Sequence, residues 1–146
     1  MEQIKKNLRT DAILVLIWAV FTLAQAVLTL IFSIDLSIFP MGVSEGDVLI
    51  AKIVIGAIAV LLLVPQLYVG IRGLQLIKNP SKAKGHIVWA TVIFVLAAVG
   101  LIPHVISIFR NGDIGESVAS ISSLTLEMLI YYDFIRHAKA LQKHAD

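Results

Sequence analysis

Long apolar stretches separated by short polar ones run through this chain, and they predict four membrane-spanning helices. A bilayer core of about 30 Å requires roughly 20 helical residues, and each stretch is long enough to cross it. The predicted spans cover residues 12–34, 48–71, 87–109 and 117–136. We therefore expect an all-α integral membrane protein with a single transmembrane domain over residues 1–146.

Turn-forming residues occupy the stretches between the predicted spans. The first connection, residues 35–47, contains proline and two glycines, the second contains Asn79-Pro80-Ser81, and the third contains Asn111-Gly112. Short connections favour an up-down-up-down helix bundle. That order places the first and fourth helices side by side.

The first apolar stretch also resembles a secretory signal, because basic residues precede it and Ala24-Gln25-Ala26 resembles a cleavage site. However, the apolar run continues from Val27 to Phe32. A mature soluble chain would turn polar after the cleavage site. We therefore interpret this stretch as an uncleaved membrane helix.

Lysine and arginine are concentrated on one side of the predicted bundle. On that side lie the N-terminal segment, the central turn and the C-terminal tail, with Lys5, Lys6, Arg9, Arg72, Lys78, Lys82, Lys84, Arg136, Lys139 and Lys143. The two opposite loops carry only Arg110, and Lys52 lies just inside the second span. Short loops rich in lysine and arginine face the cytoplasm. The pattern predicts that both termini are cytoplasmic.

Composition agrees with a membrane protein and excludes several other classes. The chain is 58% hydrophobic and only 15% charged, far from the values of a soluble domain. Its net charge of +2 comes from basic residues between apolar stretches, so orientation in the membrane explains them better than nucleic-acid binding. It has no cysteine, which excludes disulfides and thiolate metal sites. The absence of cysteine and the compact loops fit a protein of the bacterial inner membrane, which is the plasma membrane of the cell.

Small and polar residues form a stripe along one side of each predicted span. The stripes contain Trp18, Thr22, Gln25, Thr29 and Ser33; Lys52, Gly56, Ala59, Leu63, Gln66, Gly70 and Gly73; Ala90, Ala97, Gly100, His104 and Ser107; and Glu116, Ser120, Ser123, Glu127 and Tyr131. Because lipid is as apolar as leucine, membrane helices associate through such residues. We expect the stripes to meet in the middle of the bundle.

Glu127 is the main candidate for a functional group, because it lies near the middle of the fourth predicted span. An ionised carboxylate at the bilayer midplane costs about 3 kcal/mol. We therefore expect Glu127 to face the interior, either protonated or hydrogen-bonded to Gln25, Thr22 or water. Gln66 and His104 complete the candidate polar site. The alternative is an interhelical bond that only fixes helix register.

Four basic residues of the central turn form a second candidate site. Arg72, Lys78, Lys82 and Lys84 are placed to contact anionic lipid headgroups, although such residues also act only as topology signals. His137, His144 and Asp133 have a spacing that could hold a metal, but no second cluster of ligands supports one. Asp133 can instead pair with Arg136 or His137. We predict neither a metal nor a cofactor.

The sequence contains no phosphate-binding loop, nucleophile elbow or paired-carboxylate site. The leading hypothesis is a non-enzymatic membrane protein that binds a partner protein, lipid or a second copy of itself. The alternative is a small transporter or channel for protons or cations that uses Glu127. The pattern does not specify a substrate or a partner.

Overall fold

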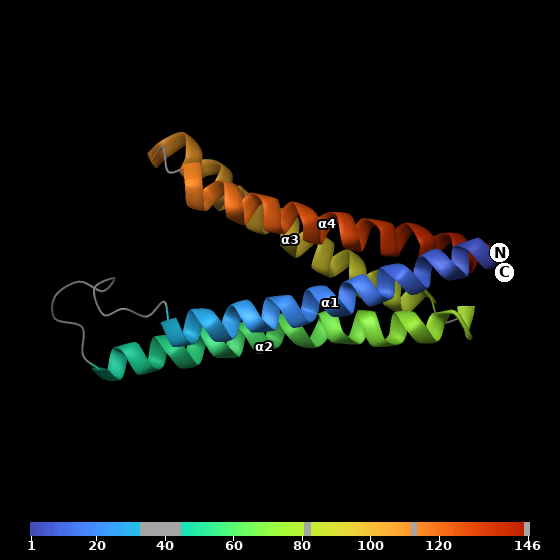
Figure 1. Ribbon diagram of the computed structural model, residues 1–146, viewed down its shortest axis with the longest axis horizontal. Helices are drawn as coiled ribbons and strands as arrows, with labels where there is room; N and C mark the ends of the chain where they lie inside the picture. The colour runs from blue at the N-terminus through green and yellow to red at the C-terminus, as the bar shows by residue number, and fades with distance from the viewer. Residues whose placement is uncertain (33–44, 81–82, 112–113, 145–146) are drawn as a thin grey trace.

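The computed structural model describes residues 1–32, 45–80, 83–111 and 114–144, which are almost entirely α-helical (Figure 1). The described helices are α1 (Glu2–Phe32), α2 (Glu45–Leu76), α3 (Ala83–Asn111) and α4 (Ile114–Lys143). Each contains a stretch that is long and apolar enough to cross a membrane. The predicted all-helical fold with four candidate spans is therefore confirmed over the described residues. Most of the predicted first loop lies outside them.

The helices extend beyond the predicted spans, most of all near the two termini. α1 begins at Glu2 and α4 ends at Lys143, whereas the predicted spans begin at residue 12 and end at residue 136. A helix of 31 residues, the length of α1, is about 46 Å long at 1.5 Å per residue. That exceeds the bilayer core of about 30 Å, so the helix ends can project beyond the hydrocarbon.

The helices pack as two antiparallel pairs that meet at one end of the molecule. α1 packs against α2, and α3 packs against α4. α1 also contacts α4, and α2 contacts α3, in agreement with the predicted up-down-up-down order. The pairs come together at the end that carries both termini and the α2–α3 turn, and they diverge toward the other end (Figure 1). We call these the terminal end and the distal end.

Among the described side chains, the buried apolar core lies toward the terminal end of each helix. Its members are Leu8, Ala12, Val15, Trp18 and Ala19 of α1, Val69 and Leu76 of α2, Ala83, Ala90, Ile93 and Ala97 of α3, and Tyr131, Phe134, Ala138 and Leu141 of α4. The stripes were predicted to meet in the middle of the bundle, and among the described side chains those toward the terminal end do so. Farther out, the two helix pairs diverge (Figure 1).

Two glycines of α2 show how tightly the helices pack at this end. A Cβ atom on Gly73 would lie 2.6 Å from the Phe134 ring and 3.1 Å from Ala12 Cβ. A Cβ atom on Gly70 would lie 2.6 Å from the Leu16 side chain. Because neither distance leaves room for a side chain, glycine permits α2 to approach both α1 and α4.

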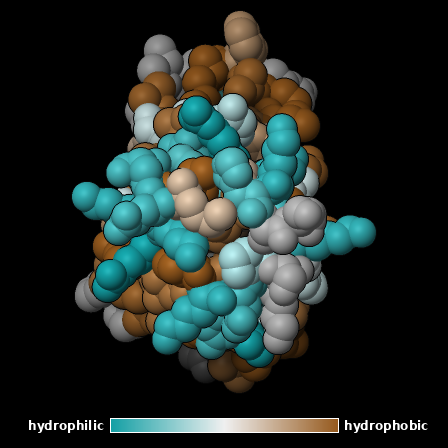
Figure 2. Space-filling model, turned by 90° about the vertical axis from the view of Figure 1, so that its right-hand side faces the viewer, coloured by the Kyte–Doolittle hydropathy of each residue, from teal (hydrophilic) through white to brown (hydrophobic). Residues whose placement is uncertain are grey.

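The outer surface is apolar along the helices and polar at the terminal end. Large hydrophobic side chains are exposed on every described helix, among them Leu61 at 71% and Phe109 at 85%. Figure 2 looks at the terminal end, where hydrophilic side chains gather on the face and hydrophobic ones lie toward its edges. This distribution suits a protein whose sides contact lipid and whose end contacts water.

Candidate functional site

Glu127 forms a hydrogen bond that joins the two helix pairs. Gln66 Nε2 of α2 donates to Glu127 Oε1 of α4 over 2.9 Å. Gln66 is 4% exposed and Glu127 is half-buried. The sequence predicted Gln25, Thr22 or water as the partner of Glu127, so the observed partner differs from the predicted protein groups. It was nevertheless part of the same candidate site.

Two aromatic side chains complete a buried polar cluster around this bond. Trp18 of α1 is 9% exposed and Tyr131 of α4 is fully buried. Both side chains interact electrostatically with the Glu127 carboxyl group. We refer to Trp18, Gln66, Glu127 and Tyr131 as the midspan cluster.

Several polar atoms of the midspan cluster have no hydrogen-bond partner among the described residues. They are Trp18 Nε1, Gln66 Oε1 and the Tyr131 hydroxyl. The indole N–H is a donor, the amide oxygen is an acceptor, and the hydroxyl group can act as either. A buried polar group without a partner costs about 1–3 kcal/mol. The Trp18 indole interacts with the Glu127 carboxyl group, but it forms no hydrogen bond of ordinary geometry with a described residue, and the same holds for Gln66 Oε1 and the Tyr131 hydroxyl.

The midspan cluster lies where the two helix pairs begin to separate. Ala19 is the last core residue of α1 toward the distal end, and Ala97 is the last of α3. Among the side chains that the structure describes, Gln66 and Tyr131 are the first buried ones of α2 and α4 from that end. The cluster thus forms the distal boundary of the packed core.

The other residues of the candidate polar site lie beyond this boundary and do not join the cluster. Thr22 is half-buried and Gln25 is exposed. Gln25 is seven residues past Trp18, or about 10 Å along the helix, where the pairs have already diverged. His104 is half-buried and lies seven residues past Ala97 in α3. The structure therefore brings Glu127 and Gln66 together, but leaves Gln25 and His104 outside their contact.

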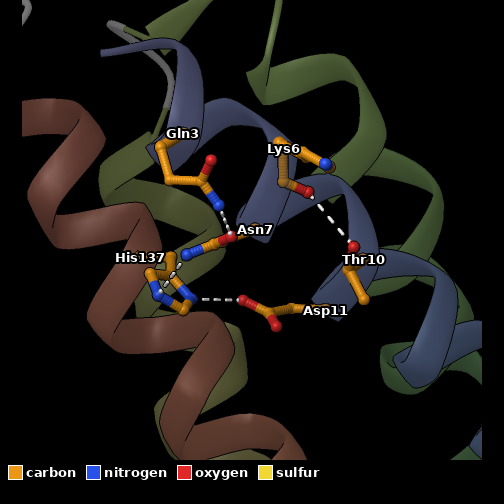
Figure 3. A network of polar contacts seen from close by, with 6 residues as sticks. All are labelled: Gln3, Lys6, Asn7, Thr10, Asp11 and His137. Atoms are coloured by element: carbon orange, nitrogen blue, oxygen red, sulfur yellow. Dashed lines mark hydrogen bonds and ion pairs between the residues drawn. The ribbon is translucent and has the colours of Figure 1, made fainter.

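A second polar network joins α1 to α4 at the terminal end (Figure 3). His137 Nδ1 lies 2.6 Å from Asp11 Oδ2, with the Asp11 side chain only 10% exposed. On the other side of the ring, Asn7 Nδ2 lies 3.4 Å from His137 Nε2. Gln3 Nε2 donates to Asn7 Oδ1 over 2.9 Å. We call Gln3, Asn7, Asp11 and His137 the terminal network.

The donors and acceptors of the terminal network are consistent with one tautomer of His137. A proton on Nδ1 is donated to the Asp11 carboxylate, which leaves Nε2 to accept from the Asn7 amide. A carboxylate that holds an imidazole in this way fixes its orientation and tautomer. Sequence reasoning missed Asp11 and instead proposed Asp133 as a partner of either Arg136 or His137. The predicted helix order could have indicated the Asp11–His137 pair, because up-down-up-down order places the start of α1 beside the end of α4.

The described residues contain no group of three histidine, cysteine, aspartate or glutamate side chains that could hold a metal ion. Asp133, His137 and His144 therefore do not form a metal site among the described residues. His137 is engaged instead by Asp11.

Arg72, Lys78 and Lys84 of the central turn lie at the terminal end, and Lys78 lies near Arg9 of α1. Arg72 donates to Gln75 Oε1 over 2.7 Å on the exposed surface. A hollow of about 490 Å³ is lined by Arg9, Leu74, Gln75, Ile77 and Lys78. Lys84 is exposed in the first turn of α3, and Lys82 lies outside the described residues. Arg9, which was predicted only as an orientation signal, thus joins Lys78 in one hollow.

Comparison with known proteins gives no assignment. No protein-family model, curated protein or solved structure matches this chain.

Proposed function

We propose that this protein is a non-enzymatic multi-pass membrane protein that acts as a binding or assembly module. Its partner is another membrane protein, lipid or a second copy of the chain. The observation that carries this proposal is the divergence of the helix pairs beyond the midspan cluster (Figure 1). Among the described side chains, the distal halves of the helices contribute no residue to the buried core shared by the two pairs.

The distal halves carry residues suited to close helix contact. Gly56, Ser120 and Ser123 are half-exposed, although they belong to the predicted inward stripes. Helices in lipid associate through small and hydroxyl-bearing residues, because these allow backbones to approach closely. A membrane partner that packs between or against the pairs would cover such residues.

In the proposed orientation, the terminal end faces the cytoplasm of a bacterial inner membrane. Basic residues of the N-terminal segment, the central turn and the C-terminal tail all belong to this end. The positive-inside rule favours the cytoplasm for such an end. The midspan cluster then lies about 15 Å deeper than His137, since Glu127 precedes it by ten residues of helix.

Purification in a mild detergent followed by native mass spectrometry tests the binding function. We expect a stoichiometric protein partner, a defined oligomer or retained lipid. Ser120→Leu and Ser123→Leu alter the distal surface and should weaken the complex, whereas Leu129→Ile on an exposed surface is the matched control. A monodisperse, lipid-free and partnerless monomer would contradict the proposal.

Anionic lipid headgroups are the proposed ligands of the basic turn. The hollow beside Arg9 and Lys78 combines cationic side chains with apolar Leu74 and Ile77, as a lipid headgroup above its acyl chains requires. Arg9→Gln together with Lys78→Gln should reduce binding to phosphatidylglycerol nanodiscs relative to Lys143→Gln. Equal binding by the two variants would refute a specific headgroup site, and displacement by free phosphate would indicate phosphate recognition instead.

Proton- or cation-linked transport remains the alternative function. The midspan cluster favours it, because an intramembrane carboxyl group with polar neighbours is typical of ion pathways. Gln25 and His104 do not extend this cluster into a continuous polar path among the described residues. Flux through proteoliposomes that is abolished by Glu127→Gln would support transport. Flux that is absent, or unchanged in the variant, would exclude a role for Glu127 in it.

A further inference from the structure

The midspan cluster has an arrangement of donors and acceptors that a single small molecule can satisfy. Trp18 Nε1–H and the Tyr131 hydroxyl group are donors, and Gln66 Oε1 is an acceptor. Glu127 accepts from Gln66 Nε2 through Oε1 only. A carboxylate has a second oxygen, so Glu127 Oε2 adds another acceptor.

From these contacts, we infer that the midspan cluster is a binding site for one internal water molecule. Water accepts two hydrogen bonds and donates two, which matches the indole and hydroxyl donors and the amide and carboxylate acceptors. Buried waters make about three such bonds to groups that otherwise lack partners. A larger polar ligand is disfavoured, because Tyr131 is fully buried and Gln66 nearly so.

The water molecule links α1, α2 and α4 at the distal boundary of the core. Trp18 lies on α1, Gln66 on α2, and Glu127 and Tyr131 on α4. In the described structure, the Gln66–Glu127 bond crosses between the pairs at this level, and the Trp18 indole also interacts with the Glu127 carboxyl group. The bound molecule therefore joins these contacts and the Tyr131 hydroxyl group in one hydrogen-bonded network.

Hydroxyl-radical labelling of the full chain in lipid nanodiscs tests this site. Radicals generated from bound water modify adjacent side chains even when bulk solvent does not reach them. Tyr131 and Phe134 are both fully buried on α4, so Phe134 is a matched control. After correction for intrinsic reactivity, we expect labelling of Tyr131 to be several-fold greater than that of Phe134.

Two substitutions of Glu127 separate a held water from general opening of the bundle. Glu127→Gln retains hydrogen-bonding groups and should keep the labelling of Tyr131. Glu127→Leu removes them and should reduce it to the level of Phe134. Equal labelling of Tyr131 and Phe134 in the native protein would overturn the inference, even if Glu127→Leu does not fold. Undiminished labelling of Tyr131 in folded Glu127→Leu would also overturn it.

Discussion

Removing the Asp11–His137 contact should measurably weaken the attachment of α1 to α4. His137→Ala deletes the imidazole and leaves the Asp11 carboxylate without its partner at 2.6 Å. Asp11→Ala instead leaves the His137 imidazole without its carboxylate partner. Asp11→Asn keeps an oxygen that can accept from Nδ1 but removes the charge, so it should cost less than Asp11→Ala.

The expected magnitude follows from burial and distance. The Asp11 side chain is only 10% exposed, so this contact is screened much less than a surface ion pair, which contributes about 0.2–1 kcal/mol. A hydrogen bond to a charged group contributes about 1.5–3 kcal/mol. We expect a coupling energy between Asp11 and His137 near the lower limit, about 1.5 kcal/mol, because the His137 side chain is 20% exposed.

A double-mutant cycle of Asp11→Ala and His137→Ala measures this coupling energy. The assay is reversible unfolding in mixed micelles, followed by far-ultraviolet circular dichroism. The matched control is the exposed Arg72–Gln75 bond at 2.7 Å, for which a helical pair at this spacing predicts about 0.2–0.5 kcal/mol. A coupling energy for Asp11–His137 no larger than that of the control would refute the reasoning.

Three further predictions follow from the packing and orientation. Gly73→Ala should lower the free energy of unfolding by about 1–3 kcal/mol, because its Cβ would meet the Phe134 ring. Gly85 has open space around it, so Gly85→Ala should not destabilise the protein in the same unfolding assay. A cycle of Gln66→Ala and Glu127→Ala should give a coupling energy of about 1 kcal/mol, and zero would argue against their bond. Reporter tags at either terminus should be protected in intact cells and accessible after permeabilisation; exposure outside would reverse the proposed orientation.

The helical fold was predictable because the length of an apolar stretch is enough to identify a helix that could span a membrane. The ends of the helices were less predictable, because hydropathy identifies apolar stretches and carries no information on contacts between helices. Leu8 and Leu141 belong to the buried core, although both lie outside the predicted spans. Their burial requires contacts between chain segments that are far apart in sequence, and a single-helix pattern carries no information on such contacts.

The candidate site was predictable in its residue types but not in its pairing. Periodicity correctly selected the faces of Glu127 and Gln66, which bond across the helix pairs. It also selected Gln25, which lies on the same side of α1 as Trp18 but is exposed. Helical periodicity gives direction around an axis, whereas the separation of the helices at each level depends on how the pairs cross.

The most direct test of the divergent helix pairs is a comparison of two spin-label distances by pulsed electron resonance in lipid nanodiscs. The chain has no cysteine, so introduced cysteines give unambiguous labels. The first pair replaces Ile71 and Val88 near the α2–α3 turn, and the second replaces Ile53 and Ile106 toward the distal end. All four side chains are exposed.

On each helix the two labelled positions are 18 residues apart, or about five full turns, so both label pairs have matching orientations. We predict a clearly longer distance between positions 53 and 106 than between positions 71 and 88. Equal distances would mean that α2 and α3 keep a constant separation along their length. That result would contradict the divergent arrangement on which the proposed binding function depends.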